Sequence, residues 1–162
     1  MSYTPLTSGR DSFMEIAIQE ALKAREAGDY AVGAVVTRGD EILAKAGNRI
    51  KLDQDPTAHA EIVAIRNTAR ILKSRHLEHC VLYTTHEPCP MCTTATIWAR
   101  MESIIYGASI EDMVAYRAKN GNSLWSWRTI DIPARTIVEK GDPKVMLVEC
   151  FMREKCRKLF HA

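Results

Sequence analysis

The chain has 162 residues, of which 46% are hydrophobic and 26% are charged, the proportions of an ordinary globular domain. At this length about two thirds of the unfolded chain's surface can be buried, which excludes collagenous, disordered and mini-protein classes. The net charge of +2 does not by itself indicate a nucleic acid or an anionic membrane as partner. We therefore expect one domain over residues 1–162 and consider a small neutral substrate at least as suitable as a polyanion.

The lack of a signal-like or membrane-spanning run and the odd number of cysteines predict a cytoplasmic protein. The N-terminal segment 1–10 lacks the apolar core of a secretory signal, and no run of about 18 apolar residues predicts a membrane span. Five cysteines are an odd number in a chain without an export signal, which argues against a disulfide framework. We expect the cysteines to bind a metal or to be buried, and we expect no membrane partner.

The first elements are a helix and a hairpin. From Asp11 and Ser12, either of which could cap a helix, small and apolar residues recur at helical spacing until Gly28. Two apolar runs then follow, 31–37 and 41–46, separated by a short polar turn. That arrangement predicts a β-hairpin.

The middle of the chain alternates helices and strands. After a polar loop, Thr57 is an acceptable N-cap for a helix over 58–72, whose apolar residues are spaced by three and four. A strand over 80–85 leads into a helix that ends near Met101, and a further strand covers 103–107. We take residues of about 11–110 as the core of the domain.

Beyond Ile110 the pattern is weaker, and we assign residues 111–162 to a specificity region and a C-terminal helix. The sequence predicts a loop over 119–126, a short helix ending at 137–140, a fifth strand over 144–149 and a basic helix over 150–160. Because the later strands are joined by helical crossovers, the element order predicts an α/β fold with a mixed sheet covered by helices on both faces.

Two short segments at predicted helix starts carry metal-binding residue types. Pro90, just inside a helix, places Cys89 at the cap and Cys92 one turn later, so both sulfurs share a face. His59 and Glu61 lie in the first turn of the preceding helix, where side chains tilt toward the N-terminus and can reach beyond the helix end. If the two helix N-termini converge, His59, Cys89 and Cys92 meet at one point.

One imidazole and two thiolates suit a tetrahedral zinc site whose fourth position is left for water, which is typical of catalytic zinc. Positive helix N-termini also favour the thiolate form of the cysteines. Glu61 is adjacent to the ligands and not needed by the metal, so it is placed to move protons as a general acid and base. We predict one Zn²⁺ per subunit, held by His59, Cys89 and Cys92, with Glu61 as the catalytic residue.

Other interpretations of a Cys-x-x-Cys pair are a redox dithiol and a closed structural zinc site. A structural site needs a fourth protein ligand. The chain offers four candidates for it: Cys80, His86, Cys150 and Cys156.

The joint pattern resembles that of the zinc-dependent cytidine/deoxycytidylate deaminase superfamily, in which H-x-E is followed at a distance by P-C-x-x-C. Here the two parts are His59-Ala60-Glu61 and Pro88-Cys89-Pro90-Met91-Cys92, with 26 residues between them. The resemblance covers Phe13 to about Gly107. It implies a three-layer α/β/α cytidine deaminase-like fold with a five-stranded mixed sheet, hydrolytic deamination and a homodimer.

Two branches of the superfamily compete as the better match. The runs 55–61 and 87–92 look like guanine deaminases, whereas tRNA adenosine deaminases share much of the first run and resemble this chain at Val32. We predict a deaminase of a free nucleobase or nucleoside, guanine-like by preference. The alternative is a tRNA-specific adenosine deaminase that forms inosine, and a zinc-stabilised interaction domain without catalysis is the third hypothesis.

The resemblance also implies substrate contacts. It places Asn48, Ala60 and Pro88 against the base or sugar, and Trp125, in a predicted loop, could contact a base. The basic terminal helix over 150–160 is either a solvated face or a tail that contacts RNA.

Overall fold

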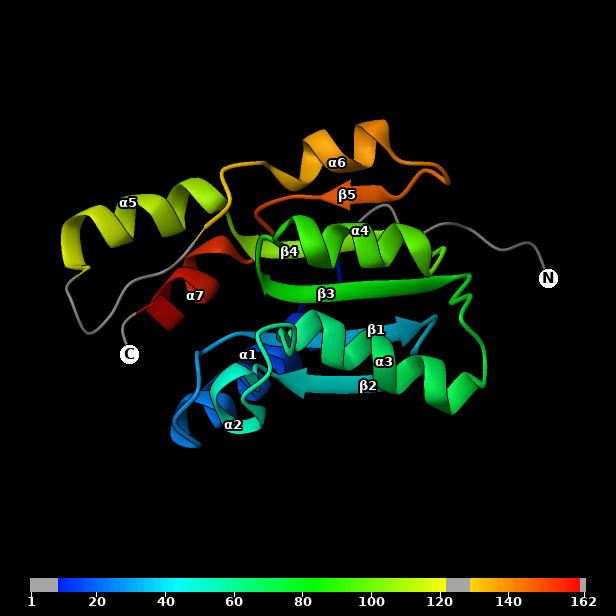
Figure 1. Ribbon diagram of the computed structural model, residues 1–162, viewed down its shortest axis with the longest axis horizontal. Coiled ribbons are helices and arrows are strands. Elements are labelled where there is room, and N and C mark those ends of the chain that lie inside the picture. The colour runs from blue at the N-terminus through cyan, green and yellow to red at the C-terminus, as the bar shows by residue number, and fades with distance from the viewer. Residues whose placement is uncertain (1–8, 122–128, 161–162) are drawn as a thin grey trace.

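The computed structural model of the protein describes residues 9–121 and 129–160 (Figure 1). In chain order its elements are α1 (Asp11–Glu26), β1 (Gly33–Arg38), β2 (Glu41–Gly47), α2 (Ile50–Asp53), α3 (Ala60–Leu72), β3 (Cys80–His86), α4 (Pro90–Trp98), β4 (Ser103–Ala108), α5 (Ile110–Asn120), α6 (Ala134–Lys140), β5 (Met146–Val148) and α7 (Arg153–Arg157), which continues into a 3₁₀ turn (Lys158–Phe160). No helix in the described ranges is long and apolar enough to cross a membrane.

The sheet has five strands in the order β2-β1-β3-β4-β5. The β1 strand pairs antiparallel with both β2 and β3, and the register with β2 shifts between Val36 and Thr37. The β3, β4 and β5 strands run parallel because α4, α5 and α6 carry the chain back between them. The predicted mixed five-stranded sheet is therefore confirmed.

Helices cover both faces of this sheet, which gives the three predicted layers. Alternate strand residues divide between two cores, so that Val35 and Ile105 face α1 and the C-terminal segment, whereas Val36 and Ile104 face α3, α4 and α6. Figure 1 shows α3 and α4 side by side in front of the sheet with α1 behind it. A Cβ on Gly33 would lie 1.9 Å from the Ala17 carbonyl oxygen, so this glycine permits the close packing of α1 on β1.

Helix starts differ from the sequence expectation in two places. Arg10 occupies the N-cap of α1, and neither Asp11 nor Ser12 does. His59, rather than Thr57, occupies the N-cap of α3, because the Thr57 backbone N–H and hydroxyl instead hydrogen-bond Asp55 in the preceding turn. The predicted helix boundary at 58 was therefore two residues early.

The C-terminal part differs most from the prediction. Helix α5 was not predicted, although Ser109 and Asp112 form a reciprocal capping box that starts it. The expected single helix over 150–160 is a short helix and a 3₁₀ turn, because Cys150 and Met152 adopt positive φ angles of 56° and 53°. Trp125 and most of the predicted 119–126 loop lie outside the described residues.

Candidate active site

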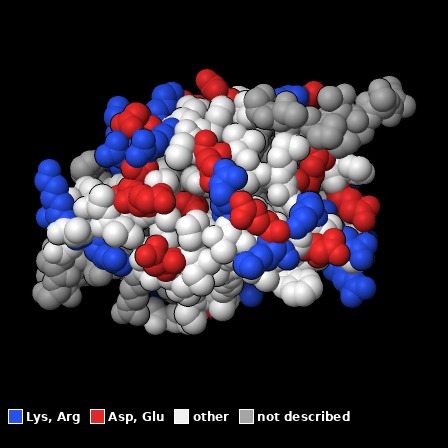
Figure 2. All heavy atoms as spheres, turned by 90° about the horizontal axis from the view of Figure 1, so that it is seen from above, with Lys and Arg blue, Asp and Glu red and all other residues white. Residues whose placement is uncertain are grey.

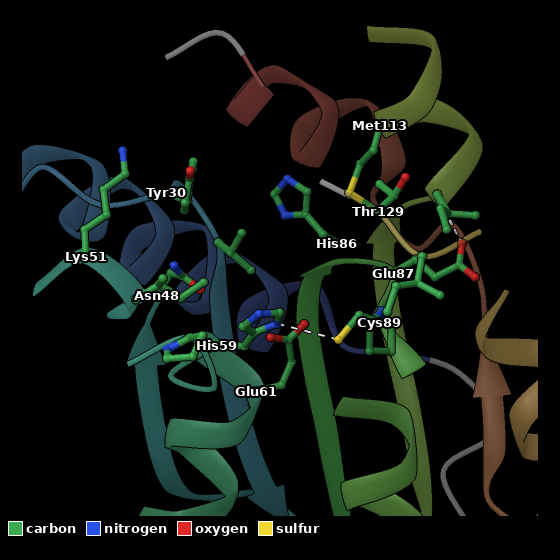
Figure 3. A pocket seen from close by; sticks show the side chains of 16 residues that line it. Tyr30, Asn48, Lys51, His59, Glu61, His86, Glu87, Cys89, Met113 and Thr129 are labelled. Carbon is green, nitrogen blue, oxygen red and sulfur yellow. Dashed lines mark hydrogen bonds between the residues drawn. The ribbon is translucent and has the colours of Figure 1, made fainter. Parts of the chain in front are cut away.

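A cavity of about 510 Å³ opens at the end of the sheet where α3 and α4 begin (Figure 3). This volume lies within the range of about 300–1,000 Å³ that is typical of small-molecule pockets. Its wall includes residues from five regions of the chain, among them His59 and Glu61 of the α3 start, Cys89 of the α4 start, Asn48 after β2 and Met113 of α5. The site therefore depends on the C-terminal region as well as on the core.

The two helix starts supply their side chains in the same way. His59 and Cys89 are the N-cap residues of α3 and α4, with extended backbones at φ −63° and −64°. N-cap side chains commonly accept a hydrogen bond from the helix backbone, but neither of these does so. Both side chains instead point toward a shared position beyond the helix ends, as Figure 3 shows.

The spacing of the three donors fits zinc. Cys89 Sγ lies 3.6 Å from Cys92 Sγ and 3.6 Å from His59 Nδ1, and Cys92 Sγ lies 3.5 Å from the same nitrogen. Tetrahedral zinc with ordinary bond lengths separates two sulfurs by about 3.8 Å, and a sulfur from a nitrogen by about 3.6 Å. His59, Cys89 and Cys92 could therefore form a zinc site without rearrangement.

No fourth protein ligand joins this group within residues 9–121 and 129–160. His86 lines the cavity, where burial lowers its pKa to about 3, but it is not part of the cluster. Cys80 and Cys156 are buried and Cys150 is exposed, each outside the cluster. The described part of the chain thus offers three ligands and an open position, the pattern of catalytic rather than structural zinc.

The thiols carry unequal proton affinities before a metal binds. The hydrogen bond from Cys92 lowers the pKa of Cys89 to about 4, which makes Cys89 a thiolate. The same contact and burial raise the pKa of Cys92, so the pair holds one proton. Because zinc binds thiolates, metal binding must release this proton.

Glu61 lies beside the three donors and is almost completely buried, with 3% of its surface exposed. The Thr84 hydroxyl donates to its Oε1 at 3.0 Å, whereas Oε2 is buried and has no hydrogen-bond partner among the described residues. Burial raises the pKa of this carboxyl. An unpartnered buried carboxylate oxygen beside a metal-ligand cluster is an unusual arrangement that a bound water or substrate would satisfy.

Asn48 is the predicted substrate residue that the structure places most clearly in the cavity. It is 3% exposed, its side-chain amide nitrogen donates to Asp29 Oδ1 at 2.8 Å, and it lines the cavity wall. Pro88 also lines the cavity. Ala60 is fully buried between His59 and Glu61, and its side chain is not part of the cavity wall.

Glu87 was not singled out from the sequence, yet it connects the metal-ligand loop to the C-terminal region. Its Oε2 accepts the backbone N–H of Ile110 at 2.7 Å, and its Oε1 accepts that of Ala134 at 2.8 Å. These are the first residues of α5 and α6. The residue before Pro88 therefore anchors two helices, of which α5 contributes Ile110 and Met113 to the cavity wall.

Most of the basic residues of the C-terminal segment pair with acidic groups of the same molecule. Arg153 donates twice to Asp112, at 2.8 and 2.6 Å, and Arg157 hydrogen-bonds Glu154. Lys155 forms an ion pair with Glu15 of α1. These contacts favour the interpretation of this segment as part of the fold over its interpretation as a free RNA-binding tail.

Comparison with known proteins places the two motifs in a family context. Residues 7–108 match the family model for the cytidine and deoxycytidylate deaminase zinc-binding region. The chain is 43% identical over 100 residues to the tRNA-specific adenosine deaminase of Aquifex aeolicus, which covers 62% of this chain and 66% of that protein. This alignment thus spans just under two thirds of the relative's length.

Similarity to guanine deaminases extends further along the chain. The guanine deaminase of Bacillus subtilis is 38% identical over 130 residues, covering 78% of this chain and 81% of that protein. The X-ray structure of guanine deaminase from B. subtilis superposes with a TM-score of 0.63 at 28% identity, covering 82% of this chain and 92% of that one. The fold is therefore shared with a guanine deaminase of known structure, and the sequence is similar both to that class and to a tRNA-specific adenosine deaminase.

Proposed function

The chain belongs to the family defined by the cytidine and deoxycytidylate deaminase zinc-binding region, and on this premise we propose that it hydrolytically deaminates a free nucleobase or nucleoside, with guanine-like purines preferred. The observation that carries the proposal is the juxtaposition of Glu61 Oε2, buried and unpartnered within the described chain, with three zinc-type donors. A structural zinc site or a simple interaction domain has no use for such a carboxylate.

Zinc held by His59, Cys89 and Cys92 would supply the Lewis acidity that makes a water molecule nucleophilic at neutral pH. Glu61 accepts a proton from the attacking water and transfers it to the ring nitrogen beside the reacting carbon. It then accepts the second proton from the newly added hydroxyl group and delivers it to the amino group, which leaves as ammonia when the C–N bond breaks. Thr84 holds Oε1 in place and leaves Oε2 to carry the proton. Asn48 and Pro88 orient the base, and Ile110 and Met113 of α5 form part of the cavity wall.

Three observations favour a small substrate over tRNA. Binding a polyanion depends on unpaired Lys and Arg contacts to phosphates, whereas Arg153, Lys155 and Arg157 are engaged within the molecule. On the face shown in Figure 2, basic side chains are interspersed with acidic ones and form no continuous basic surface. The longer alignment with the guanine deaminase, which extends into the C-terminal region, points the same way.

Deamination of adenosine in tRNA remains the second candidate because the A. aeolicus relative bears that name and has the higher identity. In that case the substrate base enters the same cavity while the rest of the RNA lies on the surface around it. The two hypotheses share Glu61 and the metal ligands and differ in what surrounds the base.

The deciding experiment is ammonia release from the purified, zinc-loaded protein. The panel comprises guanine, cytosine, adenine, their nucleosides, related triazines and a tRNA anticodon stem, with Glu61→Gln as the blank for each. Turnover of a free base or nucleoside supports the proposal, and turnover of the RNA alone supports the second candidate. If no substrate of the panel is deaminated although one zinc is bound per subunit, both hypotheses are contradicted.

The expected homodimer and cytoplasmic location stay predictions. Trp98 at the end of α4 is 75% exposed and Ile71 at the end of α3 is 58% exposed, and of these we take the larger side chain, Trp98, as a candidate contact between subunits. Sedimentation of the wild-type protein beside Trp98→Lys tests this. Dissociation of a wild-type dimer by the substitution places the interface at this surface.

A further inference from the structure

Asp29 is a buried carboxylate next to the cavity that the mechanism above does not use. Only 6% of its surface is exposed, and it accepts four hydrogen bonds. Its Oδ1 accepts from Asn48 Nδ2 at 2.8 Å and from the Tyr30 N–H at 2.8 Å. Its Oδ2 accepts from the N–H groups of Lys51 at 2.8 Å and Leu52 at 3.1 Å, in the first turn of α2.

These contacts fix the charge state of Asp29. Burial opposes ionisation, but the hydrogen bond from Asn48 and those from the three backbone N–H groups outweigh it and lower the pKa of the carboxyl. An ionised carboxylate accepts hydrogen bonds and donates none. The Asn48 amide must therefore turn its NH₂ group toward Asp29.

The orientation of Asn48 has a consequence for the cavity. Because one hydrogen of the NH₂ group is directed to Asp29, the orientation of the amide is set and its oxygen is left as an acceptor for a ligand, since no described residue donates to it. Figure 3 shows the Asn48 side chain on the wall of the cavity, on the same side as Lys51 and Tyr30. An amide alone could present either a donor or an acceptor, and here its neighbour decides which.

We propose that Asp29 is a positioning residue that sets the hydrogen-bond polarity of Asn48, so that the site accepts substrates which present an N–H or O–H donor to Asn48 Oδ1. This inference rests on the proposed function only in that the substrate lies against Asn48. It predicts that the site selects substrates by the donor or acceptor that they present to Asn48 as well as by their shape. By holding the first turn of α2, Asp29 also fixes the wall that carries Ile50 and Lys51.

The substitution Asp29→Asn tests this by changing one oxygen to an NH₂ group. If the new amide keeps its oxygen toward Asn48, its NH₂ group faces the N–H groups of Lys51 and Leu52, and both lose their acceptor. If it turns round, those two bonds are kept, Asn48 rotates to accept from the new NH₂ group, and only the Tyr30 N–H is unsatisfied. The second arrangement leaves fewer buried donors unpaired, so we expect Asn48 to rotate and present a donor to the cavity.

The activity test compares kcat and KM of four proteins on the best substrate of the panel. Asp29→Asn should lower kcat/KM at least about tenfold, mainly through KM, because a contact that precedes the chemical step is lost. The double variant Asp29→Asn/Asn48→Asp should recover most of this loss, because the exchanged carboxylate accepts from the new amide and again presents an oxygen to the cavity. Thr68→Ala is the matched control, since Thr68 is fully buried, its hydroxyl donates to the Ala64 carbonyl oxygen at 2.8 Å, and it lies near the C-terminal end of α3 and is not part of the cavity wall.

The control separates positioning from stability. Thr68→Ala should lower the melting temperature while leaving kcat/KM within about threefold of wild type. Equal losses of kcat/KM in Asp29→Asn and Thr68→Ala, or no recovery in the double variant, would overturn the inference.

A second measurement does not depend on turnover. In the full-length protein labelled with ¹⁵N and ¹³C, coupling across the hydrogen bond should connect Asn48 Nδ2 to the Asp29 carboxylate carbon. In Asp29→Asn the coupling should instead run from the new amide nitrogen to the Asn48 carboxamide carbon. Absence of the first coupling, or a coupling that still runs from Asn48 Nδ2 in the variant, contradicts the inference. This test works even if no substrate in the panel is deaminated. That separate result would contradict the proposed function.

Discussion

Removal of the Arg153 guanidinium tests whether the basic C-terminal segment belongs to the fold or to an RNA-binding surface. Arg153 makes two hydrogen bonds to Asp112, whose side chain is only 5% exposed, and Asp112 in turn starts α5. In Arg153→Met the carboxylate keeps the Ser109 backbone N–H and a longer contact of 3.6 Å to Arg157. The substitution therefore removes part of the electrostatic stabilisation of the buried Asp112 carboxylate and leaves the rest in place.

Breaking a fully buried ion pair costs about 3–5 kcal/mol. Arg153 is 45% exposed and Arg157 remains nearby, so we expect a smaller loss, about 2 kcal/mol of unfolding free energy. For a domain of this size that corresponds to a decrease of about 4–8 °C in melting temperature. Thermal unfolding followed by circular dichroism at pH 7, with urea unfolding as a second method, measures the change.

The matched control is Lys158→Met, which removes an equal charge from an exposed residue of the same segment. It should change the unfolding free energy by less than about 0.5 kcal/mol. The difference between Arg153→Met and wild type should also depend on pH. Because Arg153 lowers the pKa of Asp112 below its ordinary value of 3.8, its stabilisation is present above that value and is lost as the pH falls through the lowered pKa. If Arg153→Met is as stable as Lys158→Met and instead loses affinity for RNA, the structural interpretation of the segment is refuted.

Four further changes test the site and its supports. Glu61→Gln should retain zinc by elemental analysis and a native circular dichroism spectrum while ammonia release falls at least about 10³-fold, so residual activity within tenfold of wild type argues against its proton-transfer role. Cys89→Ser should lower bound zinc below one per subunit, and stoichiometric metal in this variant would exclude the proposed ligand set. Glu87→Gln replaces one of two helix-anchoring oxygens by a donor and should cost about 1–3 kcal/mol in urea unfolding together with a lower kcat, whereas an unchanged midpoint would show that these anchors contribute little. Gly107→Ala places a Cβ 2.2 Å from Cys156 Sγ and should destabilise by about 1–3 kcal/mol or more, which calorimetry detects; a wild-type transition would mean that α7 is free to shift.

The sequence predicted the parts of the site that depend on local patterns. Pro90 marks a helix start, so the positions of Cys89 and Cys92 at the cap and first turn follow from three residues of sequence, and the structure has Cys89 at that cap. The apolar periods of β3 and β4 and the helical spacing of α3 likewise predicted the sheet and its crossovers. These elements are defined by their own residues, and tertiary contacts only adjust where they begin and end.

What the sequence did not predict depends on contacts between distant residues. Asp29 bonds groups 19 to 23 positions away, and before the fold is known it is only a polar residue ahead of a strand. Glu87 has no local signal of its own, because its partners Ile110 and Ala134 lie 23 and 47 positions away and meet it only in the folded chain. Helix α5 has a local signal, the capping box of Ser109 and Asp112, but its apolar periodicity is too weak to predict a helix.

The two hydrogen bonds of Glu87 attach both ends of one segment of the chain to the loop that carries the metal ligands. They clamp both ends of the segment from Ile110 to Ala134 to one carboxylate, two positions before the first cysteine of the metal cluster. Insertions, deletions or substitutions between those ends change the length or sequence of a segment whose two ends stay attached to Glu87. The entropic cost of closing such a segment rises only slowly with its length. Changes in this segment could therefore alter substrate preference while the proton-transfer chemistry stays the same. It is the segment to randomise when the protein is evolved in the laboratory.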